Sequence, residues 1–328
     1  MTKIVKEHKA RQEGDGGCAN SSLDKLAQLG KRRARKWIQK PIIEQLIAYS
    51  KNPKKSLSMG EKVRWFDHFS RIANCSNVLV SKDGKVTSRY CNSRACLVCS
   101  AIRTGKLWNK YETALKGLKE PFFVTLTQGP RVSEKKLEKT IATMTKSFQD
   151  CIGVLKKRKK NLVGFRKLEV TYSTIEGTYH PHFHVLVNGE EQAYWLVAEW
   201  LKRNDKANKK AQDVRKWENE DLNEMFKYIT KFFDSEGNPI PTDAMYNLVI
   251  AMDKKRSFQT FGNFAKNTQE VDDVNEDLNP IAMDIEQGYY QWFDDTWYSH
   301  KGFKPIVETK TTKKMQQHYN KLTQWLNV

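Results

Sequence analysis

Five consecutive residues, His180-Pro181-His182-Phe183-His184, constrain the fold of this chain more than any other segment. Histidines alternate with other residues there and run on into Val185-Leu186-Val187, a pattern typical of a β-strand with one face in a core. His182 and His184 would then point to the same side, about 7 Å apart along the strand. Two imidazoles at that spacing can bind one cation. The alternative is that the histidines merely alternate on a surface or in the core.

A second strand is predicted to pair with the histidine strand. Residues 163–173 read as a strand, and the turn Ile175-Glu176-Gly177-Thr178 connects them to the histidines. An antiparallel hairpin around this turn puts Glu169 on the face that carries His182 and His184. Two imidazoles and a carboxylate suit Mg²⁺ or Mn²⁺ with open positions for a phosphate. His180 has the same parity and is a candidate third imidazole ligand or substrate contact.

The central part of the chain alternates between strand and helix patterns. Phe122–Thr127 has the composition of a strand and stops at Gly129-Pro130. Ser133 then precedes a long amphipathic segment with its apolar residues at helical spacing. Further helices are predicted at 193–201 and 221–233. The order β-α-β-β-α-α predicts an α+β fold with a central antiparallel sheet and flanking helices.

The last of these predicted helices carries a candidate nucleophile. Glu224, Tyr228 and Lys231 are spaced so that all three share one helix face. A tyrosine hydroxyl with a pKa of about 10 is a poor nucleophile at neutral pH. It can still attack a phosphodiester whose charge is held by a metal ion and a lysine. The alternatives are an exposed helical tyrosine, and a structural Glu224 paired with Lys227 or Lys231.

Four of the six cysteines gather in one region of the sequence: Cys75, Cys91, Cys96 and Cys99. The N-terminus lacks the apolar stretch of a signal peptide, so metal binding or free thiols are expected rather than disulfides. Four thiolates would close a structural Zn²⁺ site, with His68 as a possible substitute ligand and buried free thiols as the alternative. Arg94, Arg103 and Lys106 flank the cluster, which predicts contacts with DNA phosphates.

The charge of the chain points to a polyanion as partner. The formal net charge is +19, with basic clusters at residues 31–36, 156–160 and 202–216. Residues 267–299 are the exception, with nine acidic residues and no lysine or arginine. No apolar run is long enough to span a membrane, so a soluble cytoplasmic protein without a membrane partner is expected.

Three segments together resemble the motifs of the HUH endonucleases, in the order of that family: Phe122–Thr127, His180–His184 and Tyr228-Ile229-Thr230-Lys231. The closest likeness is to replication initiators of bacterial rolling-circle plasmids, and it covers about residues 75–265. It implies a core like an RNA-recognition motif. It also implies that Tyr228 nicks one strand at the plasmid origin, stays joined to the 5′ phosphate and leaves a 3′-OH primer.

The resemblance also implies roles for other residues and partners. One subgroup has a single tyrosine with a glutamate four residues before it, and Glu224 matches this position, where it would activate water for the terminating cleavage. Lys231 would steady phosphate or metal. The implied partners are origin DNA, as a single strand or an extruded hairpin, a host helicase and the replication polymerase. The rival interpretations are a single-strand HUH transposase and a non-catalytic, zinc-containing DNA-binding protein.

These observations divide the chain into four expected regions. Residues 1–60 are basic and partly disordered, with one or two helices broken at Pro41, and 61–118 form the Cys-rich zinc- and DNA-contacting part. Residues 119–265 form the nickase core, and 266–328 a partly acidic, aromatic end. For that last region the sequence leaves three roles open, which are packing on the core, mimicry of DNA charge, and contact with a helicase.

Overall fold

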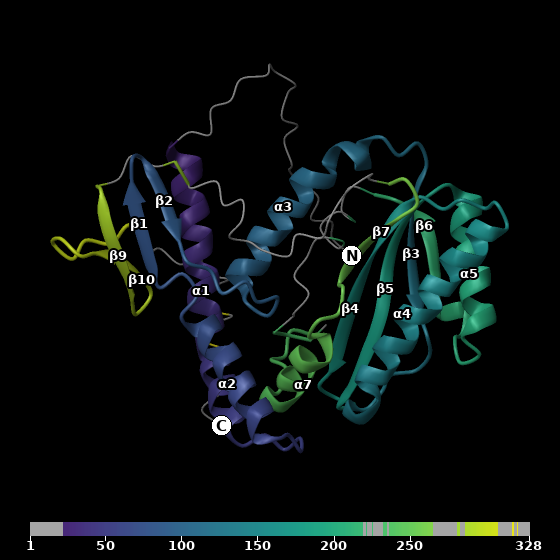
Figure 1. The fold of residues 1–328 in the computed structure, drawn as a ribbon, viewed down its shortest axis with the longest axis horizontal. Helices are drawn as coiled ribbons and strands as arrows, with labels where there is room; N and C mark the ends of the chain where they lie inside the picture. Colours follow the sequence, from purple (N-terminus) through teal and green to yellow (C-terminus); the bar gives the residue numbers. More distant parts are fainter. Residues whose placement is uncertain are drawn as a thin grey trace, which may run out of the picture.

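The structure is a computed structural model that describes residues 22–218, 232–234, 236–264, 281–282 and 286–307, with Asp221, Met225, Gln317 and Asn320. The helices are α1 (Ser22–Lys51), α2 (Met59–Ala73), α3 (Leu97–Lys116), α4 (Glu134–Lys157), α5 (Glu190–Arg203), the 3₁₀ turn η1 (Lys209–Ala211) and α7 (Thr242–Met252). The strands are β1 (Val78–Lys82), β2 (Lys85–Ser88), β3 (Pro121–Thr127), β4 (Gly164–Ser173), β5 (Thr178–Asn188), β6 (Asp213–Lys216), β7 (Phe258–Phe261), β8 (Ile281–Ala282), β9 (Gly288–Phe293) and β10 (Thr296–Ser299). The α+β class is confirmed. The strands form two antiparallel sheets (Figure 1).

One sheet, with strand order β6-β3-β5-β4-β7, contains the predicted central strands, and we call it the histidine sheet. The predicted hairpin is confirmed, since β4 and β5 pair antiparallel with Glu169 directly opposite His182. Gly177 closes the turn with a φ of 64°, a conformation that glycine adopts without strain. On the other side of β5, Thr127 of β3 also lies opposite His182. Side chains of three strands therefore meet around the histidines.

Helices α4 and α5 cover one face of the histidine sheet (Figure 1). The amphipathic pattern predicted α4 well, and its apolar residues are buried against the sheet: Leu137, Ile141, Met144, Phe148 and Leu155. From β5 Phe183 and Val185 point into the same core. Trp200 of α5 is fully buried and donates from Nε1 to the Thr127 carbonyl at 2.8 Å. This layer fixes the strands and leaves the histidines on the opposite face.

A second apolar cluster lies on that opposite face. It joins α3, the histidine sheet and two residues beyond β7 and β6: Leu107, Tyr111, Phe123, Phe165, Leu186, Met225, Phe258 and Phe264. Three of these residues share the face of His184, because residues two positions apart on a strand point to the same side. Leu186 is two positions from His184, and Phe123 and Phe165 are each two positions from the residue that pairs with His184 on the neighbouring strand. The histidine face is thus partly covered by apolar packing.

The other sheet has the order β10-β9-β1-β2-β8 and was not predicted. Its β1–β2 hairpin turns at Asp83-Gly84, where both residues have positive φ, as a two-residue type I′ turn requires. Strand β9 pairs with the outer edge of β1, so this part of the acidic, aromatic region packs on the fold. Its Trp297 is fully buried, and its Nε1 donates to the Ser76 carbonyl at 2.7 Å.

Helix α1 runs through Pro41 without ending, so the break predicted there is wrong. Proline costs one helical hydrogen bond, but burial of the neighbouring Ile42, Ile43 and Leu46 stabilises the continuous helix. Part of the basic cluster at 31–36 is also internal. Arg33 is 2% exposed and pairs with Asp295 at 2.6 Å, and Lys36 is 4% exposed.

The expected division at residues 60, 118 and 265 stays a prediction. The predicted disorder of the first residues falls outside the described residues, as does most of the helix predicted at 221–233. Among the helices that are described, none combines the length and apolarity needed to cross a membrane.

Candidate metal centres and nucleic-acid contacts

Glu169, His182 and His184 come together on the histidine sheet. One ligand atom from each lies within 4.8 Å of the other two, and all three side chains are largely buried. The two Nε2 atoms are 3.1 Å apart, and His184 Nε2 is 3.7 Å from Glu169 Oε2. Two nitrogens and a carboxylate oxygen that converge in this way fit a divalent cation of the Mg²⁺ or Mn²⁺ type, with positions left for phosphate oxygens.

Neighbouring groups orient the two imidazoles. His182 Nδ1 lies 3.0 Å from the His180 carbonyl oxygen, and His184 Nδ1 lies 3.4 Å from Thr125 Oγ1. A metal-binding histidine usually holds its second nitrogen in such a hydrogen bond, which fixes the ring and its tautomer. In both rings Nδ1 therefore has a hydrogen-bond partner, and Nε2 points to the candidate metal position.

His180 lies at the edge of this group. Its ring stacks on His182 with ring centroids 5.4 Å apart, but it is not among the three converging ligands Glu169, His182 and His184. Burial lowers its pKa to about 4, with smaller contributions from His182 and Arg131, so the ring is neutral at physiological pH. It can accept or donate one hydrogen bond there, which suits a substrate contact as well as a ligand.

Lys167 also lies in the site, although the sequence reasoning did not include it. It pairs with His184 across the strands, is 2% exposed, and its Nζ donates to Glu169 Oε2 at 3.0 Å. The parity that selected Glu169 also selects Lys167, two residues earlier on the same strand. A bound divalent cation would share Glu169 with this ammonium group.

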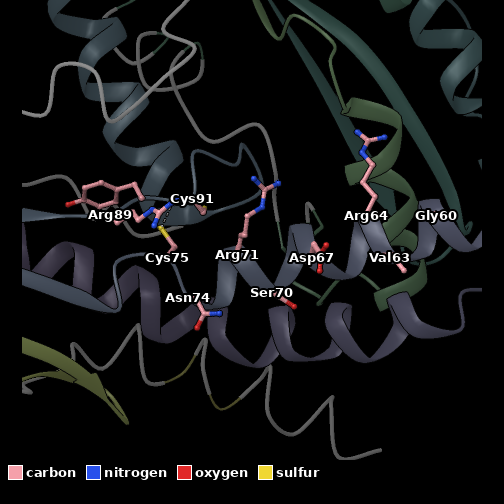
Figure 2. Close-up of a pocket in the computed structure, with 11 residues that line it drawn as sticks. Gly60, Val63, Arg64, Asp67, Ser70, Arg71, Asn74, Cys75, Arg89 and Cys91 are labelled. Carbon is pink, nitrogen blue, oxygen red and sulfur yellow. Dashed lines mark hydrogen bonds between the residues drawn. The ribbon is translucent and has the colours of Figure 1, made fainter.

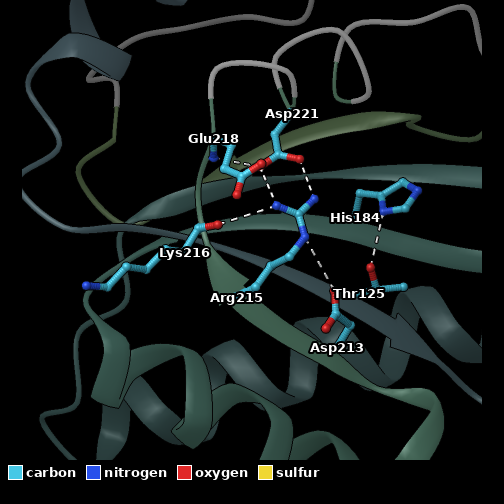
Figure 3. Close-up of polar contacts among 7 residues, drawn as sticks. All are labelled: Thr125, His184, Asp213, Arg215, Lys216, Glu218 and Asp221. Carbon is cyan, nitrogen blue, oxygen red and sulfur yellow. Dashed lines mark hydrogen bonds and ion pairs between the residues drawn. The ribbon is translucent and has the colours of Figure 1, made fainter. Parts of the chain in front are cut away.

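An arginine on β6 connects the histidine sheet to the segment that follows (Figure 3). Arg215 binds both carboxylate oxygens of Asp221, one of them at 2.7 Å, and its guanidinium lies 4.6 Å from the centroid of the Phe123 ring. Phe123 in turn contacts the His184 ring at 5.2 Å. Partial burial raises the pKa of Asp221, but hydrogen bonds and charge from Arg215 hold it below its ordinary value.

The three residues expected to carry out the chemistry, Tyr228, Glu224 and Lys231, lie outside the described residues. Two residues near them in sequence, Asp221 and Met225, are described. Asp221 is held by Arg215, and Met225 is 1% exposed within the apolar cluster on the histidine face. These two residues lie on the face that carries the candidate metal ligands.

The second candidate metal centre consists of four cysteines, from the end of α2, the segment after β2 and the start of α3: Cys75, Cys91, Cys96 and Cys99. The Sγ atoms of Cys75 and Cys91 each lie 3.5 Å from Cys99 Sγ. A tetrahedral zinc site with 2.3 Å bonds has sulfur atoms about 3.8 Å apart, so this cluster fits Zn²⁺ with little change. His68 is not part of the group, since its Nε2 lies 3.0 Å from Ser93 Oγ.

The surroundings of the cysteines favour a thiolate at Cys96, whereas hydrogen bonds with the neighbouring thiols raise the pKa of Cys75. Burial raises the pKa of Cys96, but hydrogen bonds from the three other thiols lower it well below its ordinary value. Lys36 lies close by and donates to the Cys75 carbonyl at 2.7 Å, and burial lowers its pKa to about 8. One thiolate is therefore favoured in the cluster, and a bound metal would displace the protons of the other thiols.

The basic residues flanking the cysteines mostly point inward. Arg103 is 4% exposed and donates to Asn92 Oδ1 at 2.8 Å, and half-buried Arg94 donates to the Lys255 carbonyl. Lys106 is half-buried. A cleft of about 940 Å³ beside the cluster instead has exposed Arg71 and Arg89 on its walls, together with Cys75 and Cys91 (Figure 2).

Comparison with known proteins gives a consistent result. Residues 85–301, more than half of the chain, match the family described as "Replication protein". A "Protein rep" of Staphylococcus aureus is 32% identical over 173 residues, which cover 44% of this chain and 70% of that protein. Those of Streptococcus pneumoniae serotype 2 and Bacillus amyloliquefaciens are 36% and 30% identical, over 36% and 40% of this chain and 40% and 43% of theirs. No solved structure matches.

Proposed function

The chain belongs to this family of replication proteins, and from that premise we propose that it initiates plasmid replication by nicking and rejoining one DNA strand. Because the matched part spans less than half of two of the relatives, the activity rests on this chain's own residues. The observation that carries it is the convergence of Glu169, His182 and His184, with Asp221 and Met225 attached to the same face. A metal site and the Tyr228 segment would thereby share one substrate.

The proposed reaction is a transesterification. Tyr228 Oη loses its proton to solvent as it attacks the scissile phosphorus, the bond to the 3′ oxygen breaks, and that oxygen takes a proton from solvent and leaves as a 3′-OH. The product is a 5′-phosphotyrosine, which conserves the phosphodiester for later joining. A divalent ion at the three ligands would polarise the phosphoryl oxygens. Lys231 would steady the same phosphate, and Glu224 would activate water in the terminating cleavage.

The remaining residues support this chemistry by position. Lys167 balances the charge of Glu169, so a divalent ion held by Glu169 and the two neutral imidazoles would leave the site net positive, which favours a phosphate that gains charge in the transition state. The Cys75–Cys99 cluster would hold Zn²⁺ as a structural element, because four thiolates leave no open position for catalysis. The free 3′-OH would be passed to a host polymerase, with a helicase opening the duplex ahead of it.

The test is covalent capture of labelled DNA. Wild-type protein and Tyr228→Phe are incubated with Mn²⁺ and single-stranded DNA that carries candidate origin sequences, and protein-linked label is measured on a denaturing gel. We expect an adduct that needs both Tyr228 and the metal, and that His182→Ala reduces by at least about a hundredfold.

Two outcomes would replace the proposal. If wild-type protein binds the DNA but forms no adduct with any candidate origin, a non-catalytic DNA-binding role takes over. If the adduct forms equally with Tyr228→Phe, the nucleophile is a different residue. An adduct on the hairpin end of a mobile element instead of a plasmid origin would favour the transposase.

A further inference from the structure

A basic cleft opens at the end of β3, one residue past Thr127, which lies opposite His182. It has a volume of about 690 Å³ and is formed by the loop after β3, the start of α4 and the end of α5. Five of its fourteen lining residues are lysine or arginine, and one is acidic: Arg131, Lys136, Lys139, Arg203 and Lys206, against Asp205. A concave surface with this excess of one charge concentrates its field on an anion.

Three of these cations are available to a ligand. Arg131 pairs with Glu176 at 3.3 Å and Arg203 pairs with Glu199. By contrast, Lys136, Lys139 and Lys206 are exposed and form no ion pair with any residue that the structure describes. The first turn of α4, which contains Lys136, adds the positive end of a 24-residue helix. The cleft thus offers charge that the protein itself does not neutralise.

The cleft is connected to the metal centre through the end of the sheet. Gln128, which lines the cleft, directly follows Thr127. Arg131 donates to the Thr178 carbonyl at 3.3 Å and lies close enough to His180 for its charge to affect that ring. A strand that passes His180 on leaving the metal centre would reach Arg131 and then the cleft.

The loop that forms one wall is firmly held. Gln212 accepts from the Thr127 amide at 2.8 Å and donates to the Asn208 carbonyl at 2.8 Å, which ties the segment after α5 to the end of β3. Gly129 lies so close to this loop that a Cβ there would be 3.2 Å from the Lys206 carbonyl oxygen. The position of Lys206 relative to the metal centre is therefore fixed by the fold.

We infer that this cleft binds the phosphate backbone of the single strand next to the scissile phosphate. The inference rests on the nicking function proposed above and names a contact for its substrate. No aromatic side chain is present among the lining residues, so base stacking is not expected and recognition is by charge. The cleft would hold the DNA in place during cleavage without reading its sequence.

The test compares two triple variants of the full-length protein. Lys136→Gln/Lys139→Gln/Lys206→Gln removes the three available cations. The matched control, Lys146→Gln/Lys156→Gln/Lys157→Gln, removes three exposed lysines of α4 that do not line the cleft. Affinity for a fluorescein-labelled oligothymidylate is measured by anisotropy at several NaCl concentrations, without added Mg²⁺ or Mn²⁺.

We expect the cleft variant to bind at least about tenfold more weakly, with a salt dependence of log K that is shallower by about 2, because each lost phosphate contact removes about 0.7 from the slope. The control should keep the wild-type slope. Equal losses in both variants would overturn the inference, as would a loss confined to duplex DNA. Since binding needs neither Tyr228 nor the catalytic metal, failure of the adduct experiment would sink the nicking proposal and leave this result standing.

Discussion

At the scale of single residues, the site depends on contacts between strands that are far apart in the sequence. Strand parity was enough to predict that Glu169 faces His182 and His184, because the hairpin between them is local. The same parity would have found Lys167. It could not find Arg215, since that residue reaches the site only because β6 pairs with β3, about ninety residues earlier in the chain.

Arg215 provides the first prediction at this scale. Its bidentate contact with Asp221 holds the start of the segment that carries Tyr228. Arg215→Gln should lower the rate of adduct formation at saturating DNA by about tenfold, because misplacing a reacting group by a fraction of an ångström has costs of this size. The affinity for oligothymidylate should stay within about twofold.

Lys216→Gln is the matched control, since it removes an exposed cation next in the chain. Asp221→Asn should give the same defect as Arg215→Gln, and combining the two should add little. A loss of DNA affinity equal to the loss of rate would show instead that Arg215 acts as a simple phosphate contact.

His68 provides a prediction about pH. Burial, with the charge of Arg71 adding to it, lowers its pKa to about 4 from an ordinary value near 6.5. Between these values the unfolded chain binds a proton that the folded chain does not, so stability rises with pH across this window and falls as the pH drops. The contribution of this one group is at most about 1.4 kcal/mol per pH unit.

His68→Gln keeps a polar group near Ser93 but cannot titrate. Urea unfolding at pH 7 and pH 5 should show a smaller acid-induced loss of stability in this variant than in the wild type. Identical pH dependence in the two proteins would mean that His68 is protonated in the folded state at pH 5.

At the scale of whole elements, the Cys-rich part is the clearest case for a metal that stabilises structure. The four thiols join the end of α2, the segment after β2 and the start of α3. Structural zinc contributes on the order of 10 kcal/mol in small metal-binding domains. We expect one zinc ion per chain and a loss of α2 and α3 packing when a strong chelator removes it.

Cys96→Ser should lower zinc content, measured by atomic emission, and the midpoint of thermal unfolding. Cys151→Ser is the control, because Cys151 is a buried thiol in α4 outside the cluster. Retention of full zinc content by Cys96→Ser would remove this residue from the ligand set, and absence of zinc from the wild type would favour free thiols.

The sequence patterns missed the helices α2, α3 and α7 and the short strands of the second sheet. Strands β1, β2, β9 and β10 have four to six residues each, and β9 pairs with β1 across about two hundred residues of chain. Such strands carry little periodicity of their own, and their pairing is decided by tertiary contacts. Helix α4 has long, regular periodicity instead, and it begins directly after Ser133, as predicted.

At the scale of the whole molecule, some of the positive charge is buried inside the protein. The net charge of +19 predicted a polyanionic partner, but the cluster at 31–36 includes buried Arg33 and Lys36, which contact Asp295 and the ring of Trp292. The acidic stretch thus neutralises part of α1. Which basic clusters face solvent could not be known from the sequence, because this depends on how distant segments pack.

The prediction at this scale concerns Trp297 of β10, which packs the C-terminal strands β9 and β10 against α1, β1 and β2. The ring is fully buried among Leu29, Leu79 and Val86. Trp297→Ala should lower the free energy of unfolding by about 3–5 kcal/mol. Phe293→Ala, which removes a 60% exposed ring on the same sheet, should cost less than about 1 kcal/mol. Similar losses in urea unfolding would show that Trp297 is not a central contact.

The pairing of β9 with β1 also sets the timing of folding during synthesis. Strand β1 is complete once residue 82 has been made, but the strand that covers its edge includes residues 288–293. A ribosome that adds about 5–20 residues per second needs at least ten seconds to make the intervening chain. During that interval the edge of β1 is unpaired. A nascent chain therefore cannot finish the sheet that contains β1 before the strands of the candidate metal centre and the segment with Tyr228 have both been made, which couples completion of this sheet to synthesis of the candidate site.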